Sequence, residues 1–410
     1  MRASLLDSLW SACEAGGTWW VDPERFSPTD MHAGIDGGCW NNQRGYGRFL
    51  RELLKALGEA DSSNRYTVYL DSSSYPLFDL KGPFDARCVA TSQGVAQSAT
   101  SDSHRSPLDL LRMSLAVKQP LDLFFFPSVY SYFPLLRRIP VIVGIHDTIA
   151  DRNPQFSFAS KKQEWLWRAK VRLAIAQADT ILTVSQYSKR SIAEWFHVRP
   201  GRIAVVQEAA APRFRVRDFE LPPRPFALYA GGISPNKNLV LLIRAFSRSD
   251  ARSRGAQLVL VGDYTSDRFK GNYAELKALV AELDVGHQVV FTGFVPDEEL
   301  CRLYNTCTAF VMPSLDEGFG LPAIEAMACG RPVIVSSGNA LEELVGDAGL
   351  TVNPHEVEEL AAAIDRIFSC EDLRRSLGER AIRRASEFSW ETAARQVLEV
   401  FEQTRARATR

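Results

Sequence analysis

The stretch Pro313–Gly330, which reads PSLDEGFGLPAIEAMACG, decides the fold of this chain. The run just before it, 308–312 (TAFVM), predicts a buried strand. Gly318 and Gly320 then form a turn, and Pro322 suits the first turn of the helix that follows. Strand, glycine-rich turn and helix in this order form one unit of a parallel α/β sheet, in which ligands bind at the carboxyl ends of the strands.

The turn itself has the chemistry of an anion site. The backbone N–H groups around Phe319, Gly320 and Leu321 stand at the start of the helix, where unpaired N–H groups and the helix dipole favour negative charge. The glycines at 318 and 320 allow a ligand to approach the backbone closely. These features predict a diphosphate site.

Two glutamates frame this turn. Glu317 precedes the helix and can reach the distal end of a ligand, whereas Glu325 lies about a turn inside the helix. A carboxylate at the second position suits a pair of hydroxyls, such as those of a ribose, better than phosphates. Spacing alone leaves a second interpretation open, in which both acids are capped and exposed to water.

Strand and helix patterns alternate in two series along the chain, which predicts two parallel α/β domains with right-handed crossovers. We expect strands at 31–36, 66–70, 121–126, 141–145, 180–184 and 203–206, and then at 226–230, 257–261, 288–292, 308–312 and 332–335. The proline-rich stretch 212–225 between the series predicts a linker. The domains are therefore expected at 31–218 and 219–389, with an extension at 1–30 and a final helix at 390–410.

Composition excludes several classes of protein. The chain has 410 residues, is 46% hydrophobic and 24% charged, and carries a net charge of −1, which argues against disorder and against a globally basic nucleic-acid binder. No uninterrupted apolar run approaches 18 residues. Seven scattered cysteines without C-x-x-C spacing predict reduced thiols in a cytosolic protein rather than a zinc site.

Further motifs follow other predicted strands. Each is weak alone, because a lysine in a loop or a histidine at a strand end is often only structural. No D-x-D motif occurs, so a diphosphate site that depends on a bound metal ion is not expected. No G-x-x-x-x-G-K-[ST] or complete G-x-G-x-x-G motif occurs either, so neither a P-loop nor a nicotinamide cofactor is expected. The candidates are Gly45 in GYGR, His146 in GIHD, Gly231, Gly232 and Lys237 in GGISPNK, and Val295 in GFV.

Residues 313–330 resemble the E-x7-E motif of retaining glycosyltransferase family 4 (glycosyltransferases group 1), and 342–350 (EELVGDAGL) resembles a downstream segment of that family. The resemblance covers about 31–405 and implies the GT-B fold. In that fold two Rossmann-like parallel α/β domains face a central cleft, and the C-terminal helix crosses back onto the N-terminal domain. The first domain then binds the acceptor and the second the nucleotide-sugar donor.

The family resemblance also implies roles for single residues. Glu317 contacts the hydroxyls of the donor sugar, His146 faces that sugar, and Lys237 neutralises the leaving diphosphate, so these three form the catalytic set. The family often has an arginine where this chain has Gly232, so one of two usual cations is absent. The expected donor-binding residues are Gly45, Gly231, Gly232, Lys237, Val295, Gly318, Phe319, Gly320, Leu321 and Glu325.

The function that follows is retaining transfer of a hexosyl unit from a nucleotide-diphosphate sugar to a glycan or lipid-linked acceptor, in cell-surface polysaccharide or glycoconjugate synthesis. A mannosyl donor with GDP is a guess from the loop SPNKN, 234–238. No metal or other cofactor is expected. The alternatives are a GT-B epimerase or phosphorylase and a non-catalytic partner that binds sugar nucleotides. The donor base, the linkage and the oligomeric state stay open.

The sequence leaves membrane contact undecided. The predicted helix 161–176 mixes five cations with Trp165 and Trp167. It fits either an anionic membrane surface or a core-packed helix with a basic outer face. We expect a cytoplasmic protein, with peripheral membrane contact as one alternative and no nucleic-acid partner. The loop 91–107 is either an inert surface loop or a flap over the acceptor site, and the role of 1–30 is open.

Overall fold

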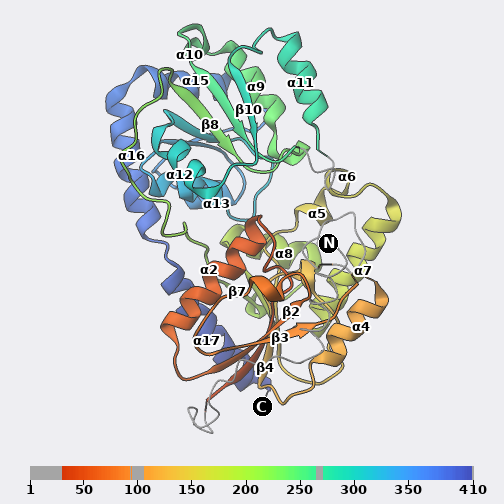
Figure 1. The fold of residues 1–410 in the computed structure, drawn as a ribbon. Helices are drawn as coiled ribbons and strands as arrows, with labels where there is room; N and C mark the ends of the chain where they lie inside the picture. Colours follow the sequence, from red (N-terminus) through yellow and green to blue (C-terminus); the bar gives the residue numbers. More distant parts are fainter. Residues whose placement is uncertain (1–29, 93, 95–105, 265–270, 409–410) are drawn as a thin grey trace, which may run out of the picture.

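The computed structural model describes residues 30–92, 94, 106–264 and 271–408. Within them the chain forms two α/β bodies, one above the other in Figure 1, each built on a single sheet. The predictions for the extension 1–30 and for most of the loop 91–107 lie outside the described residues. No helix among the described residues combines the length and the apolar character needed to cross a membrane.

The first sheet has seven strands in the order β3-β2-β1-β4-β5-β6-β7, and all neighbouring pairs are parallel. Its central strands are buried on both faces, which explains their continuous apolar sequences. The strands are β1 (His32–Asp36), β2 (Arg65–Asp71), β3 (Phe84–Val89), β4 (Leu123–Phe126), β5 (Val141–Gly144), β6 (Thr180–Thr183) and β7 (Ile203–Val205).

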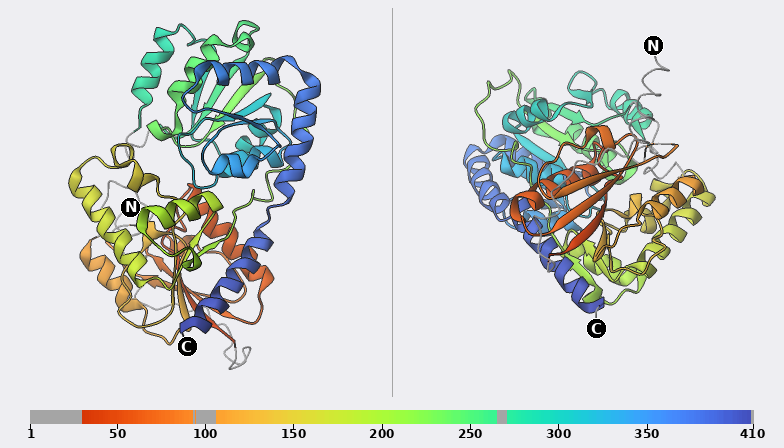
Figure 2. Two further views of the ribbon diagram at one scale, coloured as in Figure 1. Left: turned by 180° about the vertical axis from the view of Figure 1, so that it is seen from behind. Right: turned by 60° about the horizontal axis from the view of Figure 1, so that its bottom comes forward.

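Helices cover both faces of this sheet (Figures 1 and 2). The side chains of β4 contribute to the hydrophobic core on each face. Phe125 packs into the core shared with α2, whereas Phe124 and Phe126 pack into the core shared with α4 and α7. Side chains alternate between faces along a strand, so three successive phenylalanines supply both cores. The helices are α2 (Gly45–Ala60), α4 (Pro107–Ala116), α5 (Ile149–Arg152), α6 (Pro154–Ser157), α7 (Lys161–Gln177) and α8 (Gln186–Phe196).

The second sheet has six parallel strands in the order β10-β9-β8-β11-β12-β13. Its strands are β8 (Phe226–Ala230), β9 (Gln257–Val261), β10 (Val289–Gly293), β11 (Ala309–Met312), β12 (Val333–Ser336) and β13 (Leu350–Val352). The helices are α9 (Leu239–Arg248), α10 (Asp250–Ser253), α11 (Tyr273–Glu282), α12 (Asp297–Thr306), α13 (Leu321–Ala328), α14 (Ala340–Val345), α15 (Val357–Ser369) and α16 (Glu371–Ser386).

The last helix, α17 (Trp390–Ala408), returns to the first domain (Figure 2). The ring of Phe401 lies 5.4 Å from that of Phe125, and the hydroxyls of Thr404 and Thr180 are 2.8 Å apart. One buried core joins α17, α2 and the α12–α13 side of the second sheet. The GT-B fold, including the helix that crosses back, is confirmed.

Several elements were not predicted, among them strands β3 and β13 and helices α4, α14 and α16. Strand β3 is at the edge of its sheet and alternates polar and apolar residues, so it lacks the apolar run of a central strand. Helix α16 buries mainly small residues, and α4 exposes leucines that a core-facing helix would cover. The expected reduced thiols are confirmed at Cys301, Cys307, Cys329 and Cys370, but wrong at Cys88, which is disulfide-bonded.

Candidate active site between the two domains

The two domains meet where predicted site residues from each converge. His146 follows β5 of the first sheet, and Gly318 follows β11 of the second. A Cβ atom at Gly318 would stand 2.5 Å from the carbonyl oxygen of His146, so only glycine fits there. The Gly318 carbonyl in turn accepts hydrogen bonds from the hydroxyls of Ser185 (2.7 Å) and Ser188 (3.1 Å). The E-x7-E turn is therefore held directly against the first domain.

Lys237 and Glu317 form an ion pair at the same place. The Nζ atom of Lys237 lies 2.6 Å from Oε1 of Glu317, and Glu317 is buried. The neighbouring Asn236 anchors the loop, because its side-chain amide donates to the Asp316 carbonyl at 2.9 Å. Strands β8 and β11 are adjacent, so their carboxyl ends bring the 231–237 loop beside the 313–320 turn. Two motifs 80 residues apart thus form one site.

His146 is buried with both ring nitrogens facing acceptors. Nε2 donates to the carbonyl of Pro127 at 2.9 Å, and Nδ1 lies 3.4 Å from a carboxylate oxygen of Glu208. The rings of Tyr46 and Phe49 pack edge-on at 5.0 and 4.6 Å. The imidazole is thus held within the first domain, and the carbonyl oxygen of His146 faces Gly318 of the second domain.

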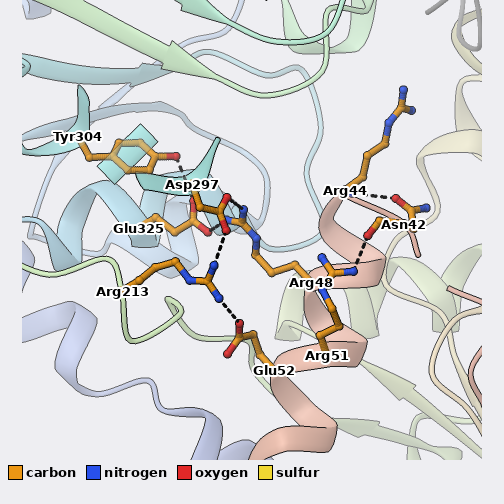
Figure 3. A network of polar contacts seen from close by, with 9 residues as sticks. All are labelled: Asn42, Arg44, Arg48, Arg51, Glu52, Arg213, Asp297, Tyr304 and Glu325. Atoms are coloured by element: carbon orange, nitrogen blue, oxygen red, sulfur yellow. Dashed lines mark hydrogen bonds and ion pairs between the residues drawn. The ribbon is translucent and has the colours of Figure 1, made fainter. Parts of the chain in front are cut away.

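Glu325 is the most deeply buried acid of the site. It accepts hydrogen bonds from the guanidinium of Arg48 in the first domain and, at 3.1 Å, from the hydroxyl of Tyr304 (Figure 3). Burial raises the pKa of Glu325 to about 7, although Arg48 and Tyr304 pull it down. The predicted exposed pair of acids is therefore excluded as an interpretation, since Glu317 and Glu325 are both buried.

Arg48 extends this contact into a network across the domains. Its second nitrogen lies 2.6 Å from Asp297 at the start of α12, and Asp297 also binds Arg213 at 2.8 Å. Arg213 in turn lies 3.3 Å from Glu52 of α2 (Figure 3). The segment between β7 and β8 is thus fixed to both domains by the side chain of Arg213.

The GYGR segment places α2 beside α13. A Cβ atom at Gly47 would lie 1.8 Å from the carbonyl oxygen of Asn42, so the loop can turn into the helix only with glycine there. A Cβ at Gly45 would be 3.9 Å from the side chain of Leu321, in the first turn of α13. Gly320, which has φ +113°, caps that helix. The starts of the two helices therefore lie side by side.

The remaining predicted residues lie along the same edge of the second sheet. Gly231 and Gly232 follow β8, and Gly232 faces open space. Val295 follows β10, two strands from β8, and packs half-buried against the core. Phe319 is buried beside Gly318 and packs edge-on against Phe388 at 6.0 Å. The order of these residues along the chain does not by itself predict which of them lie next to one another.

Several residues of the site escaped sequence analysis. Arg48 belongs to the quoted GYGR motif, but its partners stand 249 and 277 residues away. Tyr304, Asp297 and Glu208 belong to no motif. Among the residues that the structure describes, no group of three or more His, Cys, Asp or Glu side chains is placed to hold a metal ion.

Two family models match this chain in succession. Residues 44–209 match "Glycosyltransferase Family 4", and 214–384 match "Glycosyl transferases group 1". The chain belongs to the group 1 glycosyltransferases of family 4. The two matched segments of this glycosyltransferase contain His146 and the E-x7-E motif, respectively.

Two curated relatives of the glycosyltransferase carry mannosyltransferase names. It is 31% identical to "O-antigen chain mannosyltransferase B" of Escherichia coli, over 56% of this chain and 61% of that protein. It is 32% identical to "MMP alpha-(1->4)-mannosyltransferase" of Mycolicibacterium hassiacum, over 65% of this chain and 66% of that protein. The match thus spans less than two thirds of either relative.

A solved structure, sucrose-phosphate synthase from Thermosynechococcus elongatus, has the same fold as this glycosyltransferase. The TM-score is 0.72, with 21% identity over 91% of this chain and 98% of that one. At this identity the likeness supports the fold alone.

Proposed function

We propose that this chain is a retaining hexosyltransferase that moves a sugar from a nucleotide-diphosphate donor to a glycan or lipid-linked acceptor in the synthesis of a cell-surface polysaccharide or glycoconjugate. One observation carries the proposal. His146 of the first domain meets Gly318 of the second, next to the Lys237–Glu317 pair. Groups suited to a sugar and to a leaving phosphate therefore converge from both domains at one point.

The donor binds the second domain in this proposal. Glu325 receives the ribose hydroxyls, the start of α13 receives the diphosphate, and Lys237 neutralises the charge that develops on the leaving phosphate. The mannosyltransferase names of both relatives support a mannosyl donor, with GDP as its nucleotide. No metal is required, which agrees with the absence of a D-x-D motif from the sequence.

The transfer step needs no carboxylate nucleophile. The acceptor oxygen forms its bond to the anomeric carbon on the face from which the diphosphate leaves, and the acceptor proton passes to the leaving phosphate oxygen. Configuration is retained because both bonds lie on one face. Glu317 and the His146 strand end orient the sugar, while Lys237 stabilises the diphosphate.

The domains separate to admit the donor. In this structure Arg48 donates a hydrogen bond to one carboxylate oxygen of Glu325, and the His146 carbonyl fills the space beside Gly318. A bound ribose takes the place of Arg48, which keeps Asp297 as a partner. Closure over the bound donor then excludes water from the reacting groups.

An exposed surface of α4 and α7 supports peripheral contact with the cytoplasmic face of an anionic membrane. The two helices lie side by side in both figures of the fold. Leu108, Leu111 and Leu115 form an exposed stripe on α4, and α7 exposes Trp165 next to Lys161 and Lys162. Apolar side chains flanked by cations suit the boundary between lipid headgroups and acyl chains. Trp167, by contrast, is buried under Lys170 and belongs to the core.

A donor panel tests the proposed function. GDP-mannose, UDP-glucose, ADP-glucose and dTDP-glucose are compared by thermal shift and by nucleotide release, with mannose-containing oligosaccharides as acceptors. We expect one nucleotide class to stabilise the protein, by about 2.7 kcal/mol at 100 times its Kd. Lys237→Ala should retain the folded state and lose transfer, with Lys277→Ala on α11 as the control. Unchanged transfer in both Lys237→Ala and His146→Ala would refute the proposed site.

A further inference from the structure

A groove separate from the proposed donor contacts runs along α8, where the first domain faces the loop before α14. Its volume is about 380 Å³, within the usual range for small-ligand sites. The second domain borders it at Gly338. Six side chains of the first domain line it, namely Arg152, Tyr187, Arg190, Ser191, Glu194 and Trp195.

The inner end of this groove adjoins the residues proposed to hold the donor sugar. Arg152 lies 3.3 Å from the carboxylate of Asp316, the residue that precedes Glu317. On the other side, the hydroxyl of Ser191 bonds to that of Thr148, two residues after His146. A molecule in the groove therefore lies next to the point where the two domains meet.

Asp316 lies behind Arg152, is not itself one of the lining residues, and carries an unsatisfied acceptor. Its side chain is buried, with 6% of the residue exposed, and its Oδ2 is the oxygen that faces Arg152. The other oxygen, Oδ1, has no hydrogen-bond partner among the residues that the structure describes. A buried carboxylate oxygen without a donor is costly, and a ligand hydroxyl would satisfy it.

The lining is polar but balanced in charge. Arg152 is offset by Asp316, and Arg190 stands one helical turn before Glu194 on α8. No net charge remains to select a phosphate or a carboxylate. Trp195 lines the groove and is 45% exposed, and the C–H bonds of a sugar ring can pack on the electron-rich face of an indole. Hydroxyl partners beside an aromatic platform are the features that recognise an uncharged carbohydrate.

We propose that this groove is the acceptor subsite, and that it binds an uncharged hexopyranose unit of a glycan. The sugar stacks on Trp195, Arg190 and Glu194 bind its hydroxyls, and Asp316 accepts a hydrogen bond from a hydroxyl at the inner end. The inference rests on the proposed function and names the acceptor class for the same site. Glu343 keeps α8 in register with the second domain, since its carboxylate accepts the N–H groups of Gln186 (2.9 Å) and Tyr187 (2.8 Å).

The test compares Trp195→Ala with Trp165→Ala, an exposed tryptophan of α7 outside the groove. Methyl α-glycosides of mannose, glucose, galactose and N-acetylglucosamine are the probes. Saturation-transfer NMR on the full chain, with GDP and UDP present, reports binding. With a soluble oligosaccharide acceptor, initial rates give the acceptor KM, the donor KM and the rate of donor hydrolysis.

We expect saturation transfer to at least one glycoside, lost in Trp195→Ala and kept in Trp165→Ala. The acceptor KM should rise about tenfold in Trp195→Ala, with the donor KM and donor hydrolysis unchanged. Arg190→Ala, an exposed substitution, should raise the acceptor KM as well and checks that the effect is not one of folding. No binding of any glycoside, equal binding in both tryptophan variants, or displacement of the glycoside by inorganic pyrophosphate would overturn the inference.

The same measurements distinguish failure of the proposed transferase function from failure of the proposed acceptor subsite. Glycoside binding that depends on Trp195, without turnover of any donor, would reject the transferase and leave the sugar site standing. Transfer that is insensitive to Trp195 and Arg190 would retain the transferase and reject this groove as its acceptor subsite.

Discussion

Replacing Glu325 by glutamine should change how the stability of the protein depends on pH. Glu325 is buried between the domains, and its pKa is raised from the ordinary 4.5 to about 7 by burial. An acid whose pKa is higher in the folded than in the unfolded state stabilises the fold while it is protonated. The stability it contributes is complete below pH 4.5 and is lost as the pH rises to about 7.

The size of this loss follows from the two pKa values. Each pH unit between them corresponds to 1.36 kcal/mol, so the interval from 4.5 to about 7 amounts to about 3 kcal/mol. Glu325→Gln removes the ionisation but keeps an oxygen that can accept a hydrogen bond from Arg48, while its amide nitrogen can donate to the Tyr304 hydroxyl. The free energy of unfolding of wild type minus that of the variant should therefore fall by up to about 3 kcal/mol between pH 4.5 and pH 8.

Urea unfolding, followed by tryptophan fluorescence at pH 5, 6, 7 and 8, measures this difference. Other titrating groups cancel because the two proteins differ at one position. Arg48→Ala serves as a second variant: without the guanidinium the pKa of Glu325 rises further, so the loss of stability should continue above pH 7. Parallel pH profiles for wild type and Glu325→Gln would refute the reasoning, because they would mean that Glu325 is not a buried titrating acid.

Further predictions concern closure, donor binding and the membrane. Gly318→Ala should keep the domains apart, since its Cβ would lie 2.5 Å from the His146 carbonyl oxygen; small-angle scattering should show a larger radius of gyration, and Gly232→Ala, which faces open space, should not. Arg48→Ala should lower the Kd of the nucleoside diphosphate several-fold by freeing Glu325, whereas Arg51→Ala, whose guanidinium binds the backbone carbonyls of Trp40 and Asn42, should not; an unchanged Kd for Arg48→Ala in calorimetry would contradict this. Trp165→Ser should weaken co-sedimentation with vesicles containing phosphatidylglycerol but not with phosphatidylcholine vesicles, and equal sedimentation of both proteins would reject contact through α7.

Much of the fold was predictable because its signals are local. The apolar runs at β4, β5 and β11 predicted buried strands, and the leucines after Gly47 predicted α2. Prediction failed where burial does not follow hydrophobicity. Strand β3 is a half-polar edge strand, and α16 packs through Gly378 and alanines, which give no apolar periodicity.

The candidate site was predictable only in part. Lys237 and Glu317 follow strands of one parallel sheet, whose carboxyl ends share an edge, and His146 follows a strand of the other sheet. Their partners were not predictable. Glu208 beside His146 belongs to no motif. Asp316 lies within the 313–330 stretch, but its contact with Arg152, like that of Glu208 with His146, depends on how separate elements pack.

The amino-acid sequence by itself determined the two series of α/β units, the glycine-rich turns at strand ends and the residue types available for chemistry, since hydrophobic periodicity and turn preferences act over a few neighbouring residues. Only the tertiary structure decided that Arg48 pairs with Glu325 across 277 residues and that the His146 carbonyl closes on Gly318. It also decided that α8 forms a groove beside Asp316. These contacts arise from the docking of two domains, whose geometry is set by the common core of α2, α13 and α17 rather than by any local pattern.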